Sequence, residues 1–351
     1  MVPYPLGRAP SQRYRVEQFL PLLKKHHLTY RIEPFFTASE GELLYTAGNG
    51  LKKMINILRG FARRFSFLLT GLNSYDYVFI HREAAPVGPP IIEWLLRWVL
   101  KKKIIYDFDD AIWMPDPSTP SRFIQFFKAQ WKVKWICRWS HRVVAGNDYL
   151  CEYARYYNHS VTCIPTVIDM ELPEHQLKVH QSDRVVVGWT GSHSTLRFLD
   201  PLVPVLKRLQ EALPFEFLVI ADKDPNLPIK YYRFQAWSLE TERSDLRQLD
   251  IGVMPLNADL WSEGKCGFKL IQYYALGIPA LASPVGVNKA MIQSGEMGFL
   301  CETAADWERG LRQLIGSVEL REKMGREGHS RMKRRYSLGA QKESFLNLFG
   351  E

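Results

Sequence analysis

A short run of lysines and glycines carries the clearest chemical signal in this sequence. Lys265, Lys269 and Gln272 are spaced four and three residues apart, so a helix would place them on one face. Apolar residues fill the other positions, which predicts a largely buried helix with one narrow polar stripe. Buried lysines are costly unless anions meet them, and a helix N-terminus also attracts anions. We therefore expect a diphosphate above Gly267; the alternative is two lysines that simply reach water.

The elements around this run follow from the same residues. An apolar stretch at 251–256 predicts a buried parallel strand, and residues 267–276 predict a helix. Gly277 is the expected C-cap, Pro279 follows it, and residue 280 begins another strand. Earlier in the second half, a strand from residue 185 runs into a turn at Gly191 and Ser192, whose backbone amides can form a phosphate nest.

Two strands in the first half end in polar clusters. The strand at 75–80 is followed by His81, Arg82 and Glu83, and the strand at 103–106 by Asp107, Asp109 and Asp110. Ligands of open α/β sheets bind at the carboxyl ends of strands, so both clusters are expected at a ligand site. An Asp-x-Asp pair also suggests a metal ion. We expect no metal, because lysines and a helix end can neutralise a diphosphate instead. Helix capping or loop hydrogen bonding is the alternative role of these aspartates.

Residues 264–273, which read Gly-Lys-Cys-Gly-Phe-Lys-Leu-Ile-Gln-Tyr, resemble the donor-binding segment of retaining glycosyltransferases of family 4. The likeness is closest to the subgroup with the motif Gly-Lys-x-Gly-x-Lys-x-x-Gln-Tyr. It implies an α/β protein of the GT-B fold, with two Rossmann-like domains facing each other across a cleft. The expected parts are an acceptor domain at 1–170, a nucleotide-sugar domain at 184–335, and a helix at 336–351 that crosses back to the first domain.

The resemblance also assigns donor-binding residues. The wider family has an acidic pair eight residues apart, of which the second member holds the ribose and the first the donor sugar. Gln272 stands at the second position here and Gly264 at the first, with Glu263 beside it, so Glu263 or backbone amides are expected to contact the sugar. Ser192 replaces the usual arginine of the phosphate loop. Arg197 falls roughly where a lysine is usual, and Lys265 is expected to compensate.

Further roles in the first domain follow from the same likeness. Asp109 and Asp110 match the position where many members carry His-Asp near the reacting sugar, although Asp109 departs from the histidine. The first loop of the family reaches donor phosphate or acceptor, which makes Ser11, Arg13 and Arg15 candidates. We expect Arg13, His81 and Arg82 to bind the acceptor. A solvated basic helix start is the alternative for the first loop.

The resulting hypothesis is a retaining, metal-independent glycosyltransferase. It would move a sugar from a UDP- or GDP-sugar to a glycan or lipid-linked acceptor, while Lys265 and Lys269 stabilise charge on the leaving diphosphate. We identify no Ser-His-Asp set, zinc motif or nucleophilic cysteine signature in the sequence. An epimerase of the same fold, using Asp109, Asp110 and Glu263, is one alternative. A non-catalytic protein that binds anionic ligands or membranes is the other.

The composition indicates the partners and the cellular compartment of the protein. The chain has 351 residues, a formal net charge of +9 and five scattered cysteines, which indicates anionic partners and a reducing cytoplasm. The basic residues are dispersed and no nucleic-acid motif is present, so nucleic acid is not expected. Residues 51–69 predict a basic amphipathic helix that can lie on an anionic membrane, unless it only covers its own sheet. We therefore expect a cytoplasmic protein that is peripheral on the inner face of the plasma membrane.

Overall fold

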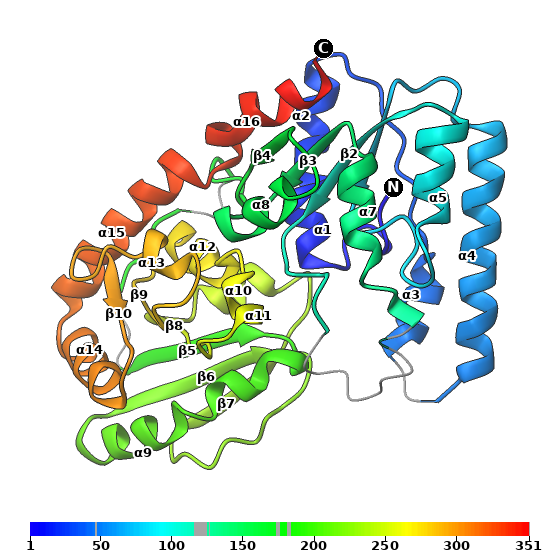
Figure 1. Ribbon diagram of the computed structural model, residues 1–351. Coiled ribbons are helices and arrows are strands. Elements are labelled where there is room, and N and C mark those ends of the chain that lie inside the picture. The colour runs from blue at the N-terminus through cyan, green and yellow to red at the C-terminus, as the bar shows by residue number, and fades with distance from the viewer. Residues whose placement is uncertain (46–47, 116–124, 126, 173–175, 181–183, 351) are drawn as a thin grey trace. The chain divides into compact units, whose positions relative to one another are not determined.

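The computed structural model describes residues 1–45, 48–115, 125, 127–172, 176–180 and 184–350 (Figure 1). The chain forms two compact units. Unit 1 comprises Met1–Thr166 together with Gln341–Glu351, and unit 2 comprises Val167–Ala340. In the described residues, no helix is both long enough and apolar enough to span a bilayer.

Unit 1 is built on a parallel sheet. Its strands are β1 (Tyr77–His81), β2 (Lys103–Phe108), β3 (Arg142–Ala145) and β4 (Val161–Cys163), hydrogen-bonded in chain order. Val2 forms an isolated parallel bridge with Pro34, and Met1 makes backbone hydrogen bonds to β1, so extended chain continues the sheet beyond β1. Residues 104–106 and 108 of β2 are wholly buried, as expected for a strand that is covered on both faces.

Helices of very different length cover this sheet. They are α1 (Pro10–Arg15), η1 (Glu17–Phe19), α2 (Leu20–Lys25), α3 (Ala38–Tyr45), α4 (Gly50–Thr70), α5 (Ile91–Trp94), the π-helical η2 (Leu95–Val99), α7 (Lys132–Trp139) and α8 (Asp148–Arg155). The apolar pattern from Arg13 onward indicates one helix, but the structure breaks it after α1. Val16 leaves helical geometry there, and Pro21 occupies the first turn of α2, where a missing N–H is tolerated.

Unit 2 contains a six-stranded parallel sheet in the order β10-β9-β8-β5-β6-β7. The strands are β5 (Val185–Gly191), β6 (Phe215–Ala221), β7 (Tyr232–Ala236), β8 (Ile251–Met254), β9 (Ala280–Ala282) and β10 (Gly298–Leu300). The first strand in the chain, β5, lies between β6 and β8. Strand order therefore reverses between β5 and β8, and the carboxyl ends of these two strands define the ligand-binding position of a doubly wound sheet.

The helices of unit 2 are η4 (His193–Leu199), α9 (Val203–Ala212), α10 (Glu242–Leu246), α11 (Leu260–Glu263), α12 (Phe268–Ala275), α13 (Asn288–Met291), α14 (Ala304–Gly316) and α15 (Val318–Arg335). Figure 1 shows α9 on one face of the sheet and α12 on the other. A Cβ atom on Gly325 of α15 would lie 1.9 Å from the carbonyl oxygen of Gly277, so only glycine permits this approach of α15 to the end of α12.

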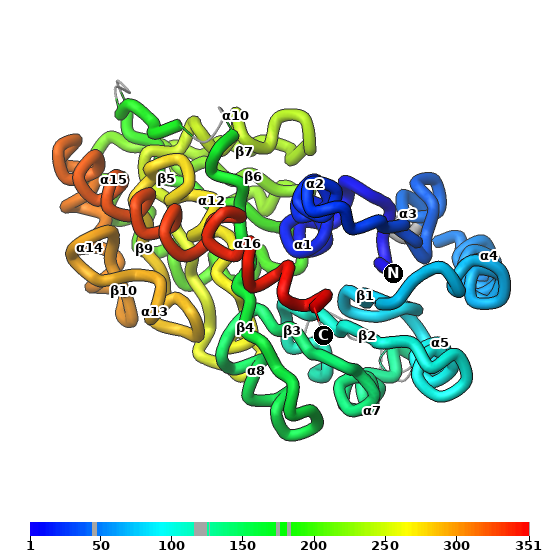
Figure 2. Tube along the Cα trace, turned by 90° about the horizontal axis from the view of Figure 1, so that it is seen from above, coloured from blue at the N-terminus to red at the C-terminus, as the bar shows by residue number. Residues whose placement is uncertain are grey.

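The chain returns to unit 1 through α16 (Leu338–Leu346) and η5 (Asn347–Phe349) (Figure 2). Phe345 stacks on Phe19 with ring centroids 3.9 Å apart. The first residues of unit 2 lie beside this return, because Ile168 pairs with Ser337 in a parallel bridge. Both connections between the units are therefore hydrogen-bonded to each other.

Candidate active site

The end of β5 and helix α12 form the first part of the site, in unit 2. The Trp189 ring is buried on β5, and the Lys269 ammonium lies 5.2 Å from its centroid. One residue further along β5, the Thr190 amide donates a hydrogen bond to the hydroxyl of Tyr273 at 3.2 Å. These contacts hold Lys269 next to the turn at Gly191 and Ser192.

Gly267 sets where α12 begins. Its φ is +69°, in the left-handed region, and a Cβ atom there would lie 2.3 Å from the sulfur of Met291. Glycine is thus required both for the backbone conformation and for the packing. Since glycine has no side chain to cap the helix, the N-terminus of α12 keeps the dipole and amide arrangement that suits an anion.

The prediction that Lys265, Lys269 and Gln272 share one helix face is wrong for Lys265. The left-handed turn at Gly267 separates Lys265 from α12, and its ammonium lies 4.8 Å from the centroid of the Trp261 ring. Glu263 ends the preceding helix α11, whose N-cap Asp259 accepts a hydrogen bond from the Ser262 amide at 2.7 Å.

Gln272 lies on the buried side of α12. Its exposed fraction is 5%, and no hydrogen bond among the described residues involves its side-chain amide. Its amide nitrogen and oxygen are not among the fully buried side-chain atoms that lack a partner in the described residues, so they reach the surface of unit 2. The donor and acceptor of this side chain are therefore suited to a ligand hydroxyl.

The turn after β5 continues into the 3-10 helix η4. The Thr195 amide and hydroxyl both donate to the Ser192 carbonyl at 2.9 Å, and the Ser192 hydroxyl pairs with that of Ser194 at 2.8 Å. The Arg197 guanidinium lies 5.2 Å from the Phe198 ring, and its buried Nε has no hydrogen-bond partner among the described residues.

One polar pair at this edge was not anticipated from the sequence. The Nδ1 of His193 lies 2.5 Å from Oδ2 of Asp222, and the His193 amide donates to Oδ1 of the same carboxylate at 2.6 Å. Each residue comes soon after the carboxyl end of a strand, β5 and β6 respectively. Their positions after two neighbouring strands are the feature of the sequence that could have predicted the contact. The pair links the carboxyl ends of β5 and β6.

A second polar network lies in unit 1 at the carboxyl ends of β1 and β2. Arg15 donates to both carboxylate oxygens of Asp107, with Nε at 3.0 Å from Oδ1 and 3.1 Å from Oδ2. His81 Nδ1 lies 2.7 Å from Oδ2 of Asp107, and His81 Nε2 lies 2.9 Å from the Ser11 hydroxyl. Burial favours a raised pKa for Asp107, but Arg15 and His81 outweigh it and lower the pKa.

This network corrects two expectations. A serine, a histidine and an aspartate do come together, although no Ser-His-Asp set is recognisable in the sequence. Arg15 occupies the carboxylate, and His81 is fully buried with both ring nitrogens engaged, so the three residues fasten α1 to the sheet. Arg15 and His81 are therefore not placed to contact an acceptor directly.

Arg82 is the strained residue of this region. Its φ is +61°, an unfavourable conformation for a side chain of this size. Its guanidinium nitrogens lie 3.8 Å from Asp109 and 3.9 Å from Asp110. Burial would raise the pKa of Asp109, but the Arg82 charge lowers it, so this carboxylate stays ionised. The structure thus brings Arg82, Asp109 and Asp110 together.

Arg13 lies nearby in sequence but packs differently. Its guanidinium stacks 5.0 Å from the Tyr14 ring and donates a hydrogen bond to the Tyr14 hydroxyl at 3.4 Å. Unlike Arg15, Arg13 is partly exposed. It therefore remains accessible to a ligand.

Comparison with known proteins connects this arrangement to one enzyme family. Residues 184–317 match the family model described as glycosyl transferases group 1. No curated protein matches the chain at the level of sequence.

Solved structures are similar over nearly the whole chain. A glycosyltransferase from Rickettsia africae ESF-5 superposes with a TM-score of 0.67 at 14% identity, covering 99% of this chain and 96% of that one. Sucrose-phosphate synthase from Thermosynechococcus elongatus gives 0.62 at 14% identity, covering 92% and 80%. Anabaena HepE in complex with UDP gives 0.62 at 13% identity, covering 94% and 88%. With its two parallel sheets the chain has the GT-B fold of these structures, and residues 184–317 of unit 2 are similar to the glycosyl transferases of group 1.

Proposed function

We propose that this enzyme transfers a sugar from a UDP- or GDP-sugar to a glycan or lipid-linked acceptor with retention of anomeric configuration. The observation that carries the proposal is the placement of Lys269. Trp189 holds this lysine at the start of α12, beside the Gly191–Ser192 turn and at the reversal point of the sheet. The similarity to HepE, whose structure contains UDP, supports a uridine donor as the first to test.

Each donor group has a residue of suitable chemistry in unit 2. The diphosphate would meet Lys269, Lys265, Arg197 and the Ser192 turn, because cations and backbone amides bind phosphate oxygens. The amide of Gln272, a residue exposed by only 5%, would hold a ribose hydroxyl. Glu263, beside the glycine at position 264, would hold a hydroxyl of the donor sugar.

The reaction would rest on electrostatic stabilisation. As the bond to the sugar breaks, negative charge builds on the leaving diphosphate, and the lysines and amides of unit 2 stabilise it. The acceptor hydroxyl attacks from the face that the diphosphate leaves, and a leaving phosphate oxygen takes its proton. In unit 1, Asp109 and Asp110 would act near the reacting sugar, while Arg82 and Arg13 bind the acceptor.

The proposed reaction needs no metal ion. Asp107 is bound through both carboxylate oxygens to Arg15 and also contacts His81, so Asp107 and Asp109 do not offer the paired oxygens that Mn²⁺ or Mg²⁺ prefers. Arg82 lies against Asp109 and places a positive charge where a cation would have to bind.

We also propose that unit 1 binds the inner face of the plasma membrane through α4. Three leucines of this helix are strongly exposed: Leu51 by 68%, Leu58 by 61% and Leu69 by 82%. The face turned inward instead carries the buried guanidinium of Arg64. An apolar surface flanked by Lys52, Lys53 and Arg59 has the chemistry of an anionic bilayer interface.

A second helical segment of unit 1 also exposes large apolar side chains. Trp94 and Trp98, in α5 and η2, are exposed by 45% and 55%, and α4 and α5 lie on the same side of unit 1 (Figures 1 and 2). Tryptophan favours the boundary between lipid and water. A lipid-linked acceptor would then be available where the enzyme docks.

Thermal unfolding with UDP, GDP and the matching nucleosides tests the donor site. A diphosphate that binds only the folded protein raises the unfolding midpoint, whereas the nucleoside alone should raise it much less. The stabilising nucleotide then identifies the sugar donors for a transfer assay, in which the anomeric configuration of the product is read by NMR. An inverted product, or no response to any diphosphate, would contradict the proposal.

A further inference from the structure

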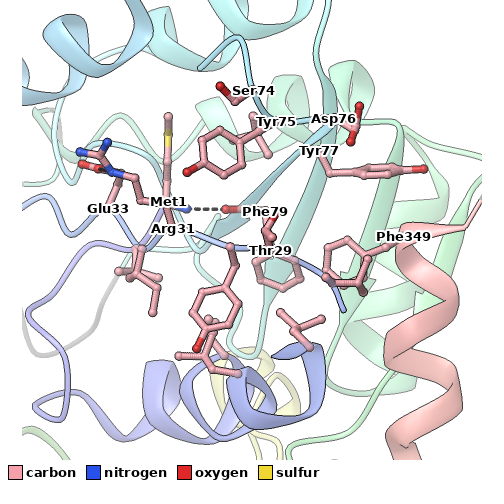
Figure 3. A pocket seen from close by; sticks show the side chains of 18 of the residues that line it. Met1, Thr29, Arg31, Glu33, Ser74, Tyr75, Asp76, Tyr77, Phe79 and Phe349 are labelled. Carbon is pink, nitrogen blue, oxygen red and sulfur yellow. Dashed lines mark hydrogen bonds and ion pairs between the residues drawn. The ribbon is translucent and has the colours of Figure 1, made fainter. Parts of the chain in front are cut away.

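Two cysteines lie together at one edge of the unit 1 sheet. On the β1 side of this sheet is a cavity of about 360 Å³, lined by residues 28–33 and 74–79 and by apolar side chains of α2 (Figure 3). The residues that line it include no cysteine. The sheet ends on the opposite side at β4, a three-residue strand that carries Cys163. Cys151, in α8, is its neighbour there, and neither cysteine takes part in the sites described above.

A single peptide group connects the positions of these two residues. Ala145 of β3 is the register partner of Cys163 in β4. The Ala145 carbonyl accepts a hydrogen bond at 3.0 Å from the amide of Ile164, the residue directly after Cys163. The same carbonyl lies 4.0 Å from the sulfur of Cys151. Helix α8 therefore brings the Cys151 thiol to the place where β3 and β4 are joined.

The two thiols also contact each other, and they differ in exposure. Cys163 is exposed, whereas Cys151 is wholly buried. A hydrogen bond between the thiols is the largest influence on both groups: it lowers the pKa of Cys163 and raises the pKa of Cys151. Burial and Asp148 oppose the change at Cys163, while the Arg15 charge adds to it. The accessible sulfur is thus the better thiolate, and the buried one holds its proton.

The other three cysteines differ from this pair. Cys137, Cys266 and Cys301 are all buried. Burial raises the pKa of Cys137 above the usual range of a thiol and raises that of Cys301 to about 12. Buried thiols of this kind are unreactive. A thiol reagent from solution should therefore react first with Cys163.

We propose that Cys151 and Cys163 form a reversible redox pair, which oxidised glutathione converts into a disulfide between α8 and β4. The Cys163 thiolate attacks one sulfur of the oxidised glutathione, so that a mixed disulfide forms and one glutathione thiolate leaves. Cys151 gives its proton to that thiolate and attacks the Cys163 sulfur, which releases the second glutathione. The two cysteines lose two electrons, and the glutathione disulfide gains them. This inference does not depend on the proposed donor or acceptor.

The new bond would hold the edge strand of unit 1. The Ile164 carbonyl, just beyond β4, accepts a hydrogen bond at 2.7 Å from Arg15, which also binds Asp107. Separation of β4 from β3 would therefore loosen the attachment of α1 as well. A disulfide that closes the loop between residues 151 and 163 restricts this opening. Oxidation should thus stabilise the part of the sheet that supports α1.

Peptide mapping of the full chain tests the disulfide. The protein is incubated with mixtures of reduced and oxidised glutathione, its free thiols are blocked, and it is digested with trypsin. Cleavage after residues 142, 155 and 178 places Cys151 in peptide 143–155 and Cys163 in peptide 156–178. Oxidation should join these two peptides, and reductant should separate them. Glutathione that stays on Cys163 with no joined peptides, or no reaction at Cys163, would overturn the proposal.

Two variants separate the roles of the cysteines. Cys151→Ala should stop at the mixed disulfide on Cys163. Cys163→Ser should take up no glutathione at Cys151, because Cys151 is buried. Since Cys163 is exposed, its replacement leaves the core unchanged, and this variant tests the pair even if Cys151→Ala does not fold. Glutathione on Cys151 of Cys163→Ser, at the rate of the wild type at Cys163, would reject the assigned order of attack.

Stability provides a second measurement on the same proteins. In the wild type, oxidation should raise the thermal unfolding midpoint by about 5 °C and should slow hydrogen exchange at the Ile164 amide. In Cys163→Ser, the same treatment should change neither quantity. An equal response of the two proteins would show that the effect does not come from a link between α8 and β4.

Discussion

At the scale of single residues, Lys269 is the side chain whose role is easiest to isolate. Its charge is held by Trp189 at the start of α12, so removing the ammonium should leave the helix in place. We expect Lys269→Ala to weaken UDP or GDP binding by roughly 1.5–3 kcal/mol, as for other charge-assisted contacts. Nucleoside binding should change little, because the lysine meets phosphate rather than base. Calorimetry with both ligands measures the difference.

The exposed Lys289 of α13 provides the control for this experiment. Lys289→Ala removes the same charge from unit 2 and should leave both affinities unchanged. If Lys269→Ala lowered nucleoside and diphosphate affinities equally, the substitution would have damaged the fold, and the phosphate contact would be rejected.

Gly267 allows a second test at this scale. Gly267→Ala places a methyl group 2.3 Å from the Met291 sulfur, in a left-handed backbone conformation. Gly295 has a φ of +87° and open space around its Cβ position, so Gly295→Ala isolates the backbone effect. Urea unfolding should show Gly267→Ala to be the more destabilising by roughly 1–3 kcal/mol, the usual cost of overpacking. Equal losses would show that Met291 moves aside without cost.

The sequence predicted which candidate residues share an element only where they are close together in the chain. Lys269 and Gln272 followed from their spacing on α12, but Lys265 did not, since one left-handed glycine changes the path of the backbone. Ser11 and His81 are 70 residues apart and still meet at 2.9 Å. No helical or strand period reports a contact between residues so distant, because it depends on how the sheet is assembled.

At the scale of elements, the Arg15–Asp107 pair fastens α1 to β2. Asp107→Asn leaves the buried Arg15 charge without its carboxylate, and the expected loss of unfolding free energy is roughly 3–5 kcal/mol. The exposed Asp76 near the start of β1 provides the control, since Asp76→Asn should cost far less. Urea unfolding of both variants near pH 7 measures the difference.

The same pair predicts a pH dependence. The pKa of Asp107 is lowered in the folded protein, because Arg15 and His81 outweigh the effect of burial. Its stabilisation is therefore present above the unfolded aspartate pKa of about 3.9 and is lost as the pH falls below it. The stabilities of the wild type and Asp107→Asn should converge toward low pH. A gap that stays constant down to acid would show that the carboxylate charge is not what stabilises α1.

Helix α4 can be tested as a membrane-binding element. Lys52→Glu with Lys53→Glu should reduce sedimentation with anionic vesicles, since each lysine near such a surface contributes about 1 kcal/mol. The exposed Lys24 and Lys25 of α2 form a control pair with the same change of charge. Binding should also weaken with salt, because the Debye length shortens from ~10 Å at 0.1 M to ~3 Å at 1 M. Unchanged binding in the α4 variant would reject this surface.

The sequence predicted where helices form better than it predicted where they are interrupted or which face they bury. The pattern at 51–69 correctly indicated a helix, and α4 spans Gly50–Thr70. Its amphipathic pattern did not reveal that Arg64 is buried while Leu58 is exposed, because three backbone carbonyls supply the partners of that guanidinium. Likewise, the apolar and basic residues at 122–139 predict one amphipathic helix, whereas α7 covers Lys132–Trp139; residues 116–124 and 126 lie outside the described part.

At the scale of the whole molecule, the chemistry should not depend on a divalent ion. Donor binding and sugar transfer should be unchanged, within about twofold, after treatment with a chelator, because cationic side chains and amides neutralise the diphosphate. The measurement is the transfer rate with and without EDTA, followed by addition of Mn²⁺. Activity that disappears in EDTA and returns with Mn²⁺ would contradict this prediction and would indicate Asp109 as a metal ligand.

Unit 1 is assembled from two separate stretches of chain, and this affects the order in which the protein can be made. Residues 341–351 belong to unit 1 but leave the ribosome after all of unit 2, and they bring Phe345 onto Phe19 and Phe79. Unit 2 comes from one continuous stretch and is free to fold as it emerges. Unit 1 cannot complete its packing until residues 341–351 have been synthesised, so part of its apolar surface stays uncovered until then. The newly made first half is therefore the part that needs protection from aggregation during synthesis.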